Sequence, residues 1–303
     1  MTPRIAETAK GLWLVYVGVS IACAISYRVA GMSWFDAVCH MFSTMGLGGF
    51  STHDASFGFF NSPAIEAVCI VFMLIAGMNF GTLFLAVSGR SLRPYFHDPE
   101  AGWFIGVTLL SILVVAMYIW KDGVYPEFET ALRHSAFNLV SIATTTGYAS
   151  VDYALWPIFA PLWMLFLSSF ATSAGSTGGG IKMIRALLLY KKVYRGLLRA
   201  MHPNAVYNIR IGGQVAPQPI LFAVLGFAFM YMVSIVSLTL IMAFTGLDII
   251  SAFTAVVASI NNTGPGLGVV GPSTTYEALE DFQTWICTFA MLLGRLEIFT
   301  LLV

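Results

Sequence analysis

Three short glycine-containing peptides are the parts of this sequence best suited to hold a metal ion without a charged side chain. They are Leu47-Gly48-Gly49, Thr145-Thr146-Gly147 and Asn262-Thr263-Gly264. A dehydrated alkali cation needs a ring of oxygens, and backbone carbonyls supply them without a net charge that would trap the ion. Glycine suits such a strand because aiming successive carbonyls at one axis requires dihedral angles that a Cβ resists. The peptides therefore predict a carbonyl-lined filter for an alkali cation.

The three peptides occupy equivalent positions in an internal repeat. Aligning Gly49, Gly147 and Gly264 brings three longer stretches into register, namely 33–52, 127–150 and 247–268. Each stretch has an acidic or proline-marked start, amphipathic helix, and then a Gly/Thr/Ser-rich extended end. Non-helical backbone at membrane depth is tolerated only where it is buried in protein or lines water. The repeat therefore predicts three re-entrant segments around a shared aqueous centre.

The elements that must position these segments are membrane spans. The chain has 303 residues, of which 58% are hydrophobic and 10% charged, whereas soluble domains are roughly half apolar and a quarter charged. A helix needs about 20 apolar residues to cross a bilayer. Six apolar segments are suited to this role: 12–27, 63–87, 103–120, 156–172, 220–244, and a last one from 282 through 293 and onward. We expect an all-α integral membrane protein of repeated membrane-pore-membrane units, with re-entrant pore helices and extended filter strands around a central pathway.

The repeats divide the chain into three predicted units. They cover residues 1–98, 99–210 and 211–303. The second unit has a broken second span and a basic segment, and the third is truncated at its C-terminus.

Basic residues are sorted along the chain in a way that predicts its orientation. They precede the first span, follow the second, and cluster between the fourth and fifth at 191–210. Cytoplasmic loops carry an excess of Lys and Arg. We therefore expect a multi-pass protein whose N-terminus lies in the cytoplasm. The basic cluster would suit either a protein partner or anionic lipid head groups.

A glycine-rich segment interrupts the apolar stretch 156–190. Residues 173–180 contain Gly175, Gly178, Gly179 and Gly180, which break a helix at membrane depth. A phosphate-binding loop is disfavoured, because lysine is displaced and no hydroxyl residue follows it. A Gly-x-Ser-x-Gly nucleophile elbow fails as well, because an alanine stands in place of the first glycine.

Two basic residues stand out, Lys182 just after this segment and Arg295 in the last apolar stretch. Arg295 falls deep in the last span, where a lipid-facing charge is costly, so we expect it to point inward toward carbonyls, a carboxylate or water. The alternative is a side chain that snorkels from a helix end. Lys182 would either add a positive charge at the inner mouth of the pathway or reach the membrane interface.

Five longer motifs make the sequence similar to a known family. It resembles the Trk/Ktr/HKT superfamily of potassium transporters, and within it most closely the bacterial Trk potassium uptake subunit. The motifs are GGFSTHDASFGFF, AGSTGGGIKMIRALLLYK, HPNAVYNI, NNTGPGLGVV and GRLEIFTLLV. Residues 145–148 also resemble the start of the TVGYG potassium-channel filter. The resemblance implies potassium uptake across the bacterial inner membrane, through four membrane-pore-membrane repeats whose key filter glycines match Gly49, Gly147 and Gly264.

The resemblance also implies a gate and partners. The gate would be the intramembrane loop Gly175-Ser176-Thr177-Gly178-Gly179-Gly180 with Lys182 and Arg295. The expected partners are potassium, the lipid bilayer, a second copy of the chain in a homodimer, and a cytosolic nucleotide-binding regulatory subunit of the TrkA type. The nucleotide would be on that partner, and we expect no cofactor on this chain besides K⁺, and no nucleic acid. The family's first repeat is absent, so we expect a fragment of a longer protein.

Two other functions stay open at this point. An intramembrane hydrolase would use Ser176 with His134 or His40, but an enzyme has no use for three equivalent glycine strands, so we expect no enzymatic activity. A non-conducting structural membrane subunit is the other alternative, because the fourth filter strand is missing. The preference for K⁺ over Na⁺ does not follow from the sequence, since selectivity depends on coordination geometry.

Overall fold

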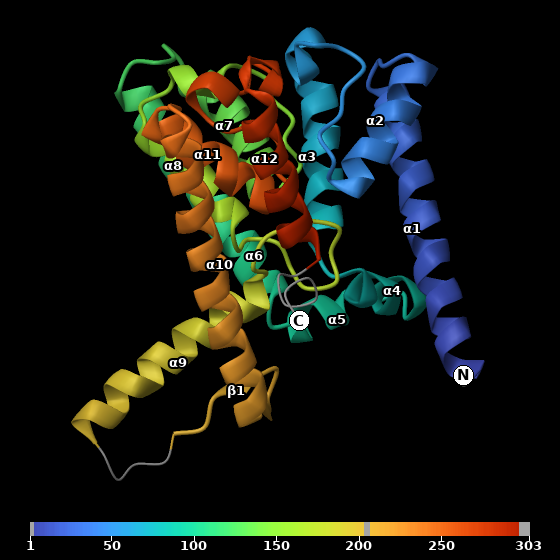
Figure 1. Ribbon diagram of the computed structural model, residues 1–303. Coiled ribbons are helices and arrows are strands. Elements are labelled where there is room, and N and C mark those ends of the chain that lie inside the picture. Colours follow the sequence, from blue (N-terminus) through green and yellow to red (C-terminus); the bar gives the residue numbers. More distant parts are fainter. Residues whose placement is uncertain (1–2, 203–206, 297–303) are drawn as a thin grey trace.

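The computed structural model describes residues 3–202 and 207–296, and it shows a helical membrane fold (Figure 1). Among the described residues, three helices are long and apolar enough to cross a membrane: α1 (Pro3–Val29), through its part 9–29, α6 (Ala101–Lys121) and α10 (Gln218–Phe244). Large apolar side chains on their surfaces are exposed, including Trp13 and Phe229. Exposed apolar side chains of this kind are expected where helices face lipid rather than water.

The second predicted span is not one straight helix, so the prediction of a continuous span at 63–87 is wrong. The chain forms α3 (Pro63–Gly77) and α4 (Phe80–Ser88), which are bent by 100° at the break between them. Asn79 causes a new helix start, because its side-chain oxygen accepts a hydrogen bond from the Gly81 N–H at 2.7 Å. As a result α4 and the short α5 (Arg93–His97) lie across the lower end of the bundle in Figure 1.

The predicted break within the stretch 156–190 is present, but it begins after Ser168, four residues earlier than predicted. The helix α8 (Phe159–Ser168) has only ten residues, and α9 (Met183–Met201) begins after an irregular segment at 169–182. We call this segment the intramembrane loop. A small antiparallel hairpin follows α9, made of β1 (Arg210–Ile211) and β2 (Gln214–Val215).

The three predicted re-entrant helices are present. They are α2 (Trp34–Gly46), α7 (Phe128–Ala143) and α11 (Ile249–Ile260), all in the upper part of Figure 1. Each packs against the span that precedes it: α2 on α1, α7 on α6 and α11 on α10. Ser33 and Asp248 cap α2 and α11 by accepting backbone N–H groups.

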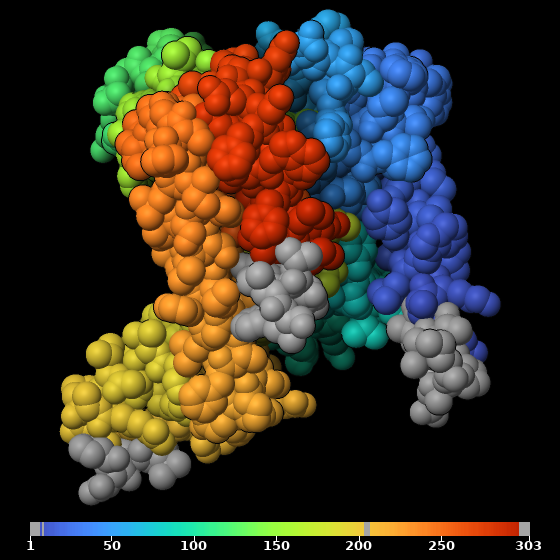
Figure 2. Space-filling view, in the orientation of Figure 1, coloured from blue at the N-terminus to red at the C-terminus, as the bar shows by residue number. Residues whose placement is uncertain are grey.

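The last helix closes one side of this arrangement. The helix α12 (Asp281–Arg295) begins with a capping box between Glu280 and Gln283. It packs on α11, and Figure 2 shows it in red between α10 and the blue part of the chain that holds α2 and α3. In the described part of the chain, four short 3₁₀ turns join the helices, at η1 (Ser56–Phe59), η2 (Tyr153–Leu155), η3 (Gly268–Val270) and η4 (Tyr276–Ala278).

Candidate ion-permeation site

Each re-entrant helix ends in the same hydrogen-bonded turn. After α2, the Leu47 N–H donates to the Thr44 carbonyl at 3.2 Å, and the Gly48 N–H donates to the Ser43 carbonyl at 2.8 Å. This pair of bonds is the Schellman motif. The equivalent pairs are Thr145 to Ile142 and Thr146 to Ser141 after α7, and Asn262 to Ser259 and Thr263 to Ala258 after α11. The three repeats therefore match bond for bond at the point where their strands begin.

The backbone of each strand is left-handed at two alternate positions. The first residue after the turn has a positive φ, with 50° at Leu47, 61° at Thr145 and 54° at Asn262. The predicted filter glycines follow two residues later, with 70° at Gly49, 92° at Gly147 and 100° at Gly264. In a regular strand, successive residues and their carbonyls point to opposite sides. A left-handed residue at every second position turns successive carbonyls toward the same side instead. This conformation is costly for Thr and Leu, so surrounding contacts must hold it in place.

The strands pack directly against one another in order. A Cβ added at Gly49 would lie 2.1 Å from the Thr146 carbonyl oxygen, and one added at Gly147 would lie 2.1 Å from that of Thr263. A Cβ added at Gly264 would meet no described atom within 4 Å. The first strand thus packs on the second and the second on the third, whereas the third strand has an open edge at Gly264.

All nine predicted filter residues line one cavity of about 570 Å³, together with the face of α12. The C-terminal ends of α2, α7 and α11 lead into these strands, and a helix C-terminus carries partial negative charge. The lining by the strands is uncharged, and Arg295 is the one charged residue among the described lining residues. The cavity therefore offers neutral oxygens and helix dipoles to a cation.

The intramembrane loop closes one end of this cavity. The Thr177 hydroxyl donates to the Met45 carbonyl at 3.0 Å, and the Gly179 N–H donates to the Thr145 hydroxyl at 2.8 Å. A Cβ at Gly179 would lie 1.9 Å from the Asn261 carbonyl oxygen. Residues 177–179 thus touch the C-terminal end of all three re-entrant helices. The larger part of the predicted gate, Gly175, Ser176, Gly178, Gly180 and Lys182, does not line the cavity.

Both predicted cations contact this loop. Arg295 Nη1 donates to the Thr177 carbonyl at 3.1 Å, which confirms the expected inward orientation toward a carbonyl. Lys182 Nζ donates to the Gly178 carbonyl and lies 3.4 Å from the Ser176 hydroxyl. The ammonium of Lys182 therefore makes contacts within the loop, whereas Arg295 connects the loop to α12.

The loop is also bonded to the bend between α3 and α4, a connection that sequence reasoning missed. The Ser173 N–H donates to the Gly77 carbonyl at 3.0 Å, and the Phe80 N–H donates to the Gly175 carbonyl at 3.2 Å. Asn79 within an apolar run was the available signal for this bend, because asparagine favours helix starts over helix interiors.

The far end of the first strand is fixed to its own helix. Asp36 Oδ1 accepts the Thr52 hydroxyl at 2.7 Å, and His40 Nε2 lies 3.0 Å from the Ser51 hydroxyl. Hydrogen bonds from Thr52 and then Ser33 lower the pKa of Asp36, so it stays a charged acceptor.

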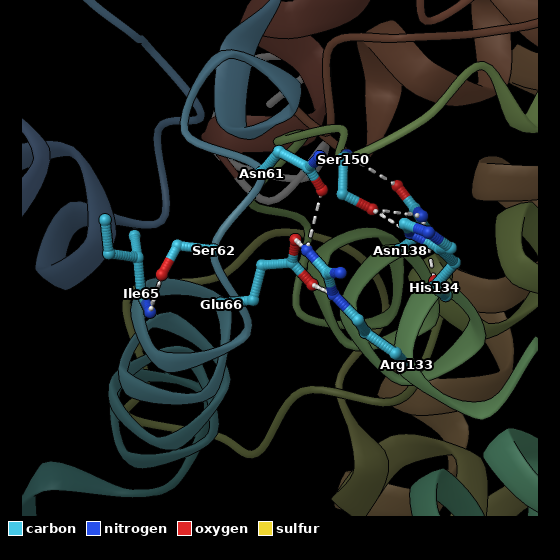
Figure 3. A network of polar contacts seen from close by, with 8 residues as sticks. All are labelled: Asn61, Ser62, Ile65, Glu66, Arg133, His134, Asn138 and Ser150. Atoms are coloured by element: carbon cyan, nitrogen blue, oxygen red, sulfur yellow. Dashed lines mark hydrogen bonds and ion pairs between the residues drawn. The ribbon is translucent and has the colours of Figure 1, made fainter. Parts of the chain in front are cut away.

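A second polar network joins α3, α7 and the second strand (Figure 3). Arg133 contacts the buried Glu66 through two bonds, at 2.6 and 2.9 Å, and donates to Asn61 at 3.0 Å. His134 Nδ1 lies 3.2 Å from the Ser150 hydroxyl, and Ser150 also accepts the Asn138 amide. Sequence reasoning missed the Arg133–Glu66 pair.

These contacts leave the hydrolase alternative without support. The two histidines bond Ser51 and Ser150, and the Ser176 hydroxyl lies beside Lys182 instead. A serine nucleophile needs a base within hydrogen-bond reach. Neither histidine is within such reach of Ser176 in the described contacts.

We expect Glu66→Gln to destabilise the protein by about 2 kcal/mol, because it leaves the partly buried Arg133 without its charged partner. The check is the midpoint of thermal unfolding in detergent, which should fall for Glu66→Gln. The control Glu277→Gln, at an exposed residue of η4, should leave the midpoint unchanged. An equal midpoint for both variants would show that the Arg133–Glu66 pair contributes nothing.

Comparison with known proteins agrees with this geometry. The family model described as "TrkH: Cation transport protein" matches residues 1–303. The chain belongs to the TrkH family. The Trk system potassium uptake protein TrkH of Salmonella typhimurium is 49% identical over the whole chain, and TrkG of Escherichia coli is 36% identical. The crystal structure of the potassium transporter TrkH from Vibrio parahaemolyticus covers all of this chain with a TM-score of 0.94 and 46% identity.

The match extends over the whole chain but only over part of these TrkH family members. The chain spans 62% of the length of the Salmonella and Escherichia proteins and 64% of the Vibrio chain. Family membership and the all-helical membrane fold are therefore established for this chain, and both were expected from the sequence.

Proposed function

We propose that this chain forms part of a potassium permeation pathway in which residues 47–49, 145–147 and 262–264 are filter strands. One observation carries the proposal: the same alternating left-handed backbone occurs three times around one cavity. Backbone carbonyls in such strands replace the water shell of an alkali cation. Potassium is the ion that the names of the family relatives give.

The intramembrane loop is the proposed gate. Its residues 177–179 support this role by lying against the ends of all three re-entrant helices, and Arg295 adds a positive charge at the same level. A cation leaving the cavity past the loop would meet both obstacles. Movement of the loop would take residues 177–179 out of the pathway. It would also displace the Thr177 carbonyl, which is the hydrogen-bond partner of Arg295.

The proposed orientation rests on charge. The side that holds α4, α5 and α9 in Figure 1 is the proposed cytoplasmic side, because Arg90, Arg93 and the basic residues of α9 lie there. The chain would then sit in the bacterial inner membrane with its N-terminus in the cytoplasm. The proposed partners are a second copy of the chain and a cytosolic nucleotide-binding regulatory subunit, with the basic face of α9 and the β hairpin as a docking surface.

The proposed units remain 1–98, 99–210 and 211–303, each containing one re-entrant helix. Their cores are α1 to α4, α6 to α9, and α10 to α12. Residues 203–206, in the basic segment, and 297–303, at the end of the third unit, lie outside the described part.

Growth of cells that lack their own potassium uptake tests this function. We expect the protein, as expressed from its gene, to restore growth at limiting potassium and to take up rubidium. Membrane insertion without uptake would favour the non-conducting structural subunit, for which the open edge at Gly264 is the supporting observation.

A further inference from the structure

A buried carboxylate is bonded on both sides of the glycine-rich part of the intramembrane loop. Glu100, the residue before α6, is 5% exposed. Its Oε2 accepts the Ala174 N–H at 2.8 Å and the Ile184 N–H at 3.1 Å. Ala174 precedes the glycines of the loop, and Ile184 lies in the first turn of α9. One oxygen atom thus bonds the chain on both sides of the segment 175–180.

The carboxylate stands on a fixed base. The Glu100 N–H donates to Asp98 Oδ1 at 2.9 Å, and the Glu100 carbonyl accepts the Phe104 N–H at 2.8 Å inside α6. Asp98 in turn accepts the Thr82 hydroxyl of α4 at 2.6 Å. Contacts with α4 and α6 therefore limit the movement of Glu100 itself.

The start of α9 needs an acceptor from elsewhere in the chain. The first N–H groups of a helix have no partner within it. Lys182 occupies the capping position with a φ of 78° and provides no side-chain cap. Glu100 supplies the acceptor, and its negative charge also matches the positive end of the helix dipole. Burial raises the pKa of Glu100, whereas the hydrogen bond from the Ala174 N–H lowers it.

We infer that Glu100 is a positioning residue that holds the intramembrane loop in its closed place beneath the filter. This inference rests on the proposed gate. While both bonds to Glu100 are made, residues 175–180 form a short closed segment whose ends cannot separate, and residues 177–179 stay against the re-entrant helices. Opening requires at least one of the two bonds to break.

The test measures basal potassium flux in proteoliposomes that contain the protein as expressed from its gene. Glu100→Ala should raise basal flux by about tenfold, because losing a charged hydrogen bond shifts a two-state equilibrium by roughly that factor. Glu100→Gln keeps an oxygen that can accept both N–H groups, so it should restore low flux. The preference for K⁺ over Na⁺ should stay constant in both variants, because Glu100 touches no filter residue. A purely structural role would lower flux or abundance in both.

A reporter cysteine measures the position of the loop directly. Ser176→Cys, in a background where the cavity-lining Cys287 is replaced by alanine, is treated with a membrane-impermeant thiol reagent. Its modification should be faster with Glu100→Ala than with Glu100→Gln. Equal rates and equal flux would overturn the inference.

A variant of the loop itself separates this inference from the proposed gate. Gly179→Ala places a methyl group where the Asn261 carbonyl lies 1.9 Å away, so it should also raise basal flux. If Gly179→Ala raises flux and Glu100→Ala does not, the inference on Glu100 fails and the gate stands. If neither raises flux, the gate fails and the inference with it.

Discussion

Gly147→Ser should lower the preference for K⁺ over Na⁺ by about tenfold or more. Gly147 has a φ of 92°, and a left-handed backbone costs a residue with a Cβ roughly 1–2 kcal/mol. The new Cβ would also lie 2.1 Å from the Thr263 carbonyl oxygen and 3.0 Å from Pro265 Cδ. Because about 1.4 kcal/mol corresponds to a factor of ten, the conformational cost alone approaches the expected change.

The damage should spread beyond the substituted strand. The Thr263 carbonyl belongs to the third filter strand, so its displacement changes the ligands of two strands at once. Gly49→Ser should behave alike, since its Cβ would displace the Thr146 carbonyl of the second strand. The loss should therefore appear as reduced selectivity before it appears as reduced folding.

The measurement compares rubidium and sodium uptake in proteoliposomes at equal protein abundance. Gly18→Ser is a matched control, because Gly18 is exposed on α1 and a Cβ there meets no described atom within 4 Å. An unchanged ratio of the two uptake rates in Gly147→Ser would contradict the assignment of residues 145–147 to a filter.

The sequence indicated the three glycine-containing turns at residues 47–49, 145–147 and 262–264 because their backbone geometry is local. Schellman turns and left-handed residues depend on a few neighbouring residues, and Gly49, Gly147 and Gly264 mark them directly. Each glycine motif alone is weak evidence, but their occurrence at three equivalent positions of the repeat supports a common role. The inward orientation of Arg295 was predictable for a different reason, because an arginine within a span costs much free energy if it faces lipid.

The bend at Asn79 and the role of Glu100 were not predicted, because both depend on contacts distant in sequence. Hydropathy is equally high in α3 and α4, so an average over 63–87 hides the capping residue between them. Glu100 bonds residues 74 and 84 positions away. No periodic pattern near Glu100 predicts such a pairing, although acidic residues at the start of a span are an available signal.

The same limit applies to Glu66 and Arg133, which are 67 positions apart. Each looks ordinary within its own helix, and opposite charges in one sequence pair in many ways. The pairing is decided by the position of the buried Glu66 beside the partly buried Arg133. Burial is a property of the packed helices rather than of either sequence segment.

Arg295→Gln should raise basal potassium flux by about tenfold at low ionic strength. Arg295 is the charged residue among the described lining of the cavity, and its guanidinium bonds the Thr177 carbonyl at 3.1 Å. A unit charge about 4 Å from a passing cation opposes it by about 1 kcal/mol at the dielectric constant of water and by about 4 kcal/mol where the effective dielectric constant is near 20. The substitution removes this repulsion and weakens the bond between α12 and the loop, so both effects act in the same direction.

A conservative variant distinguishes the two effects. Arg295→Lys keeps the charge but loses the planar guanidinium that reaches Thr177, so low flux in this variant assigns the barrier to charge, and high flux assigns it to the bond with the loop. Added salt should reduce the difference between Arg295 and Arg295→Gln if repulsion dominates, because the side chain is exposed to the cavity and is screened. Arg93→Gln, on the exposed surface of α5, is the control and should leave flux unchanged. Flux that stays the same or falls in Arg295→Gln would show that cations do not pass this residue, and the pathway below the filter would then have to run elsewhere.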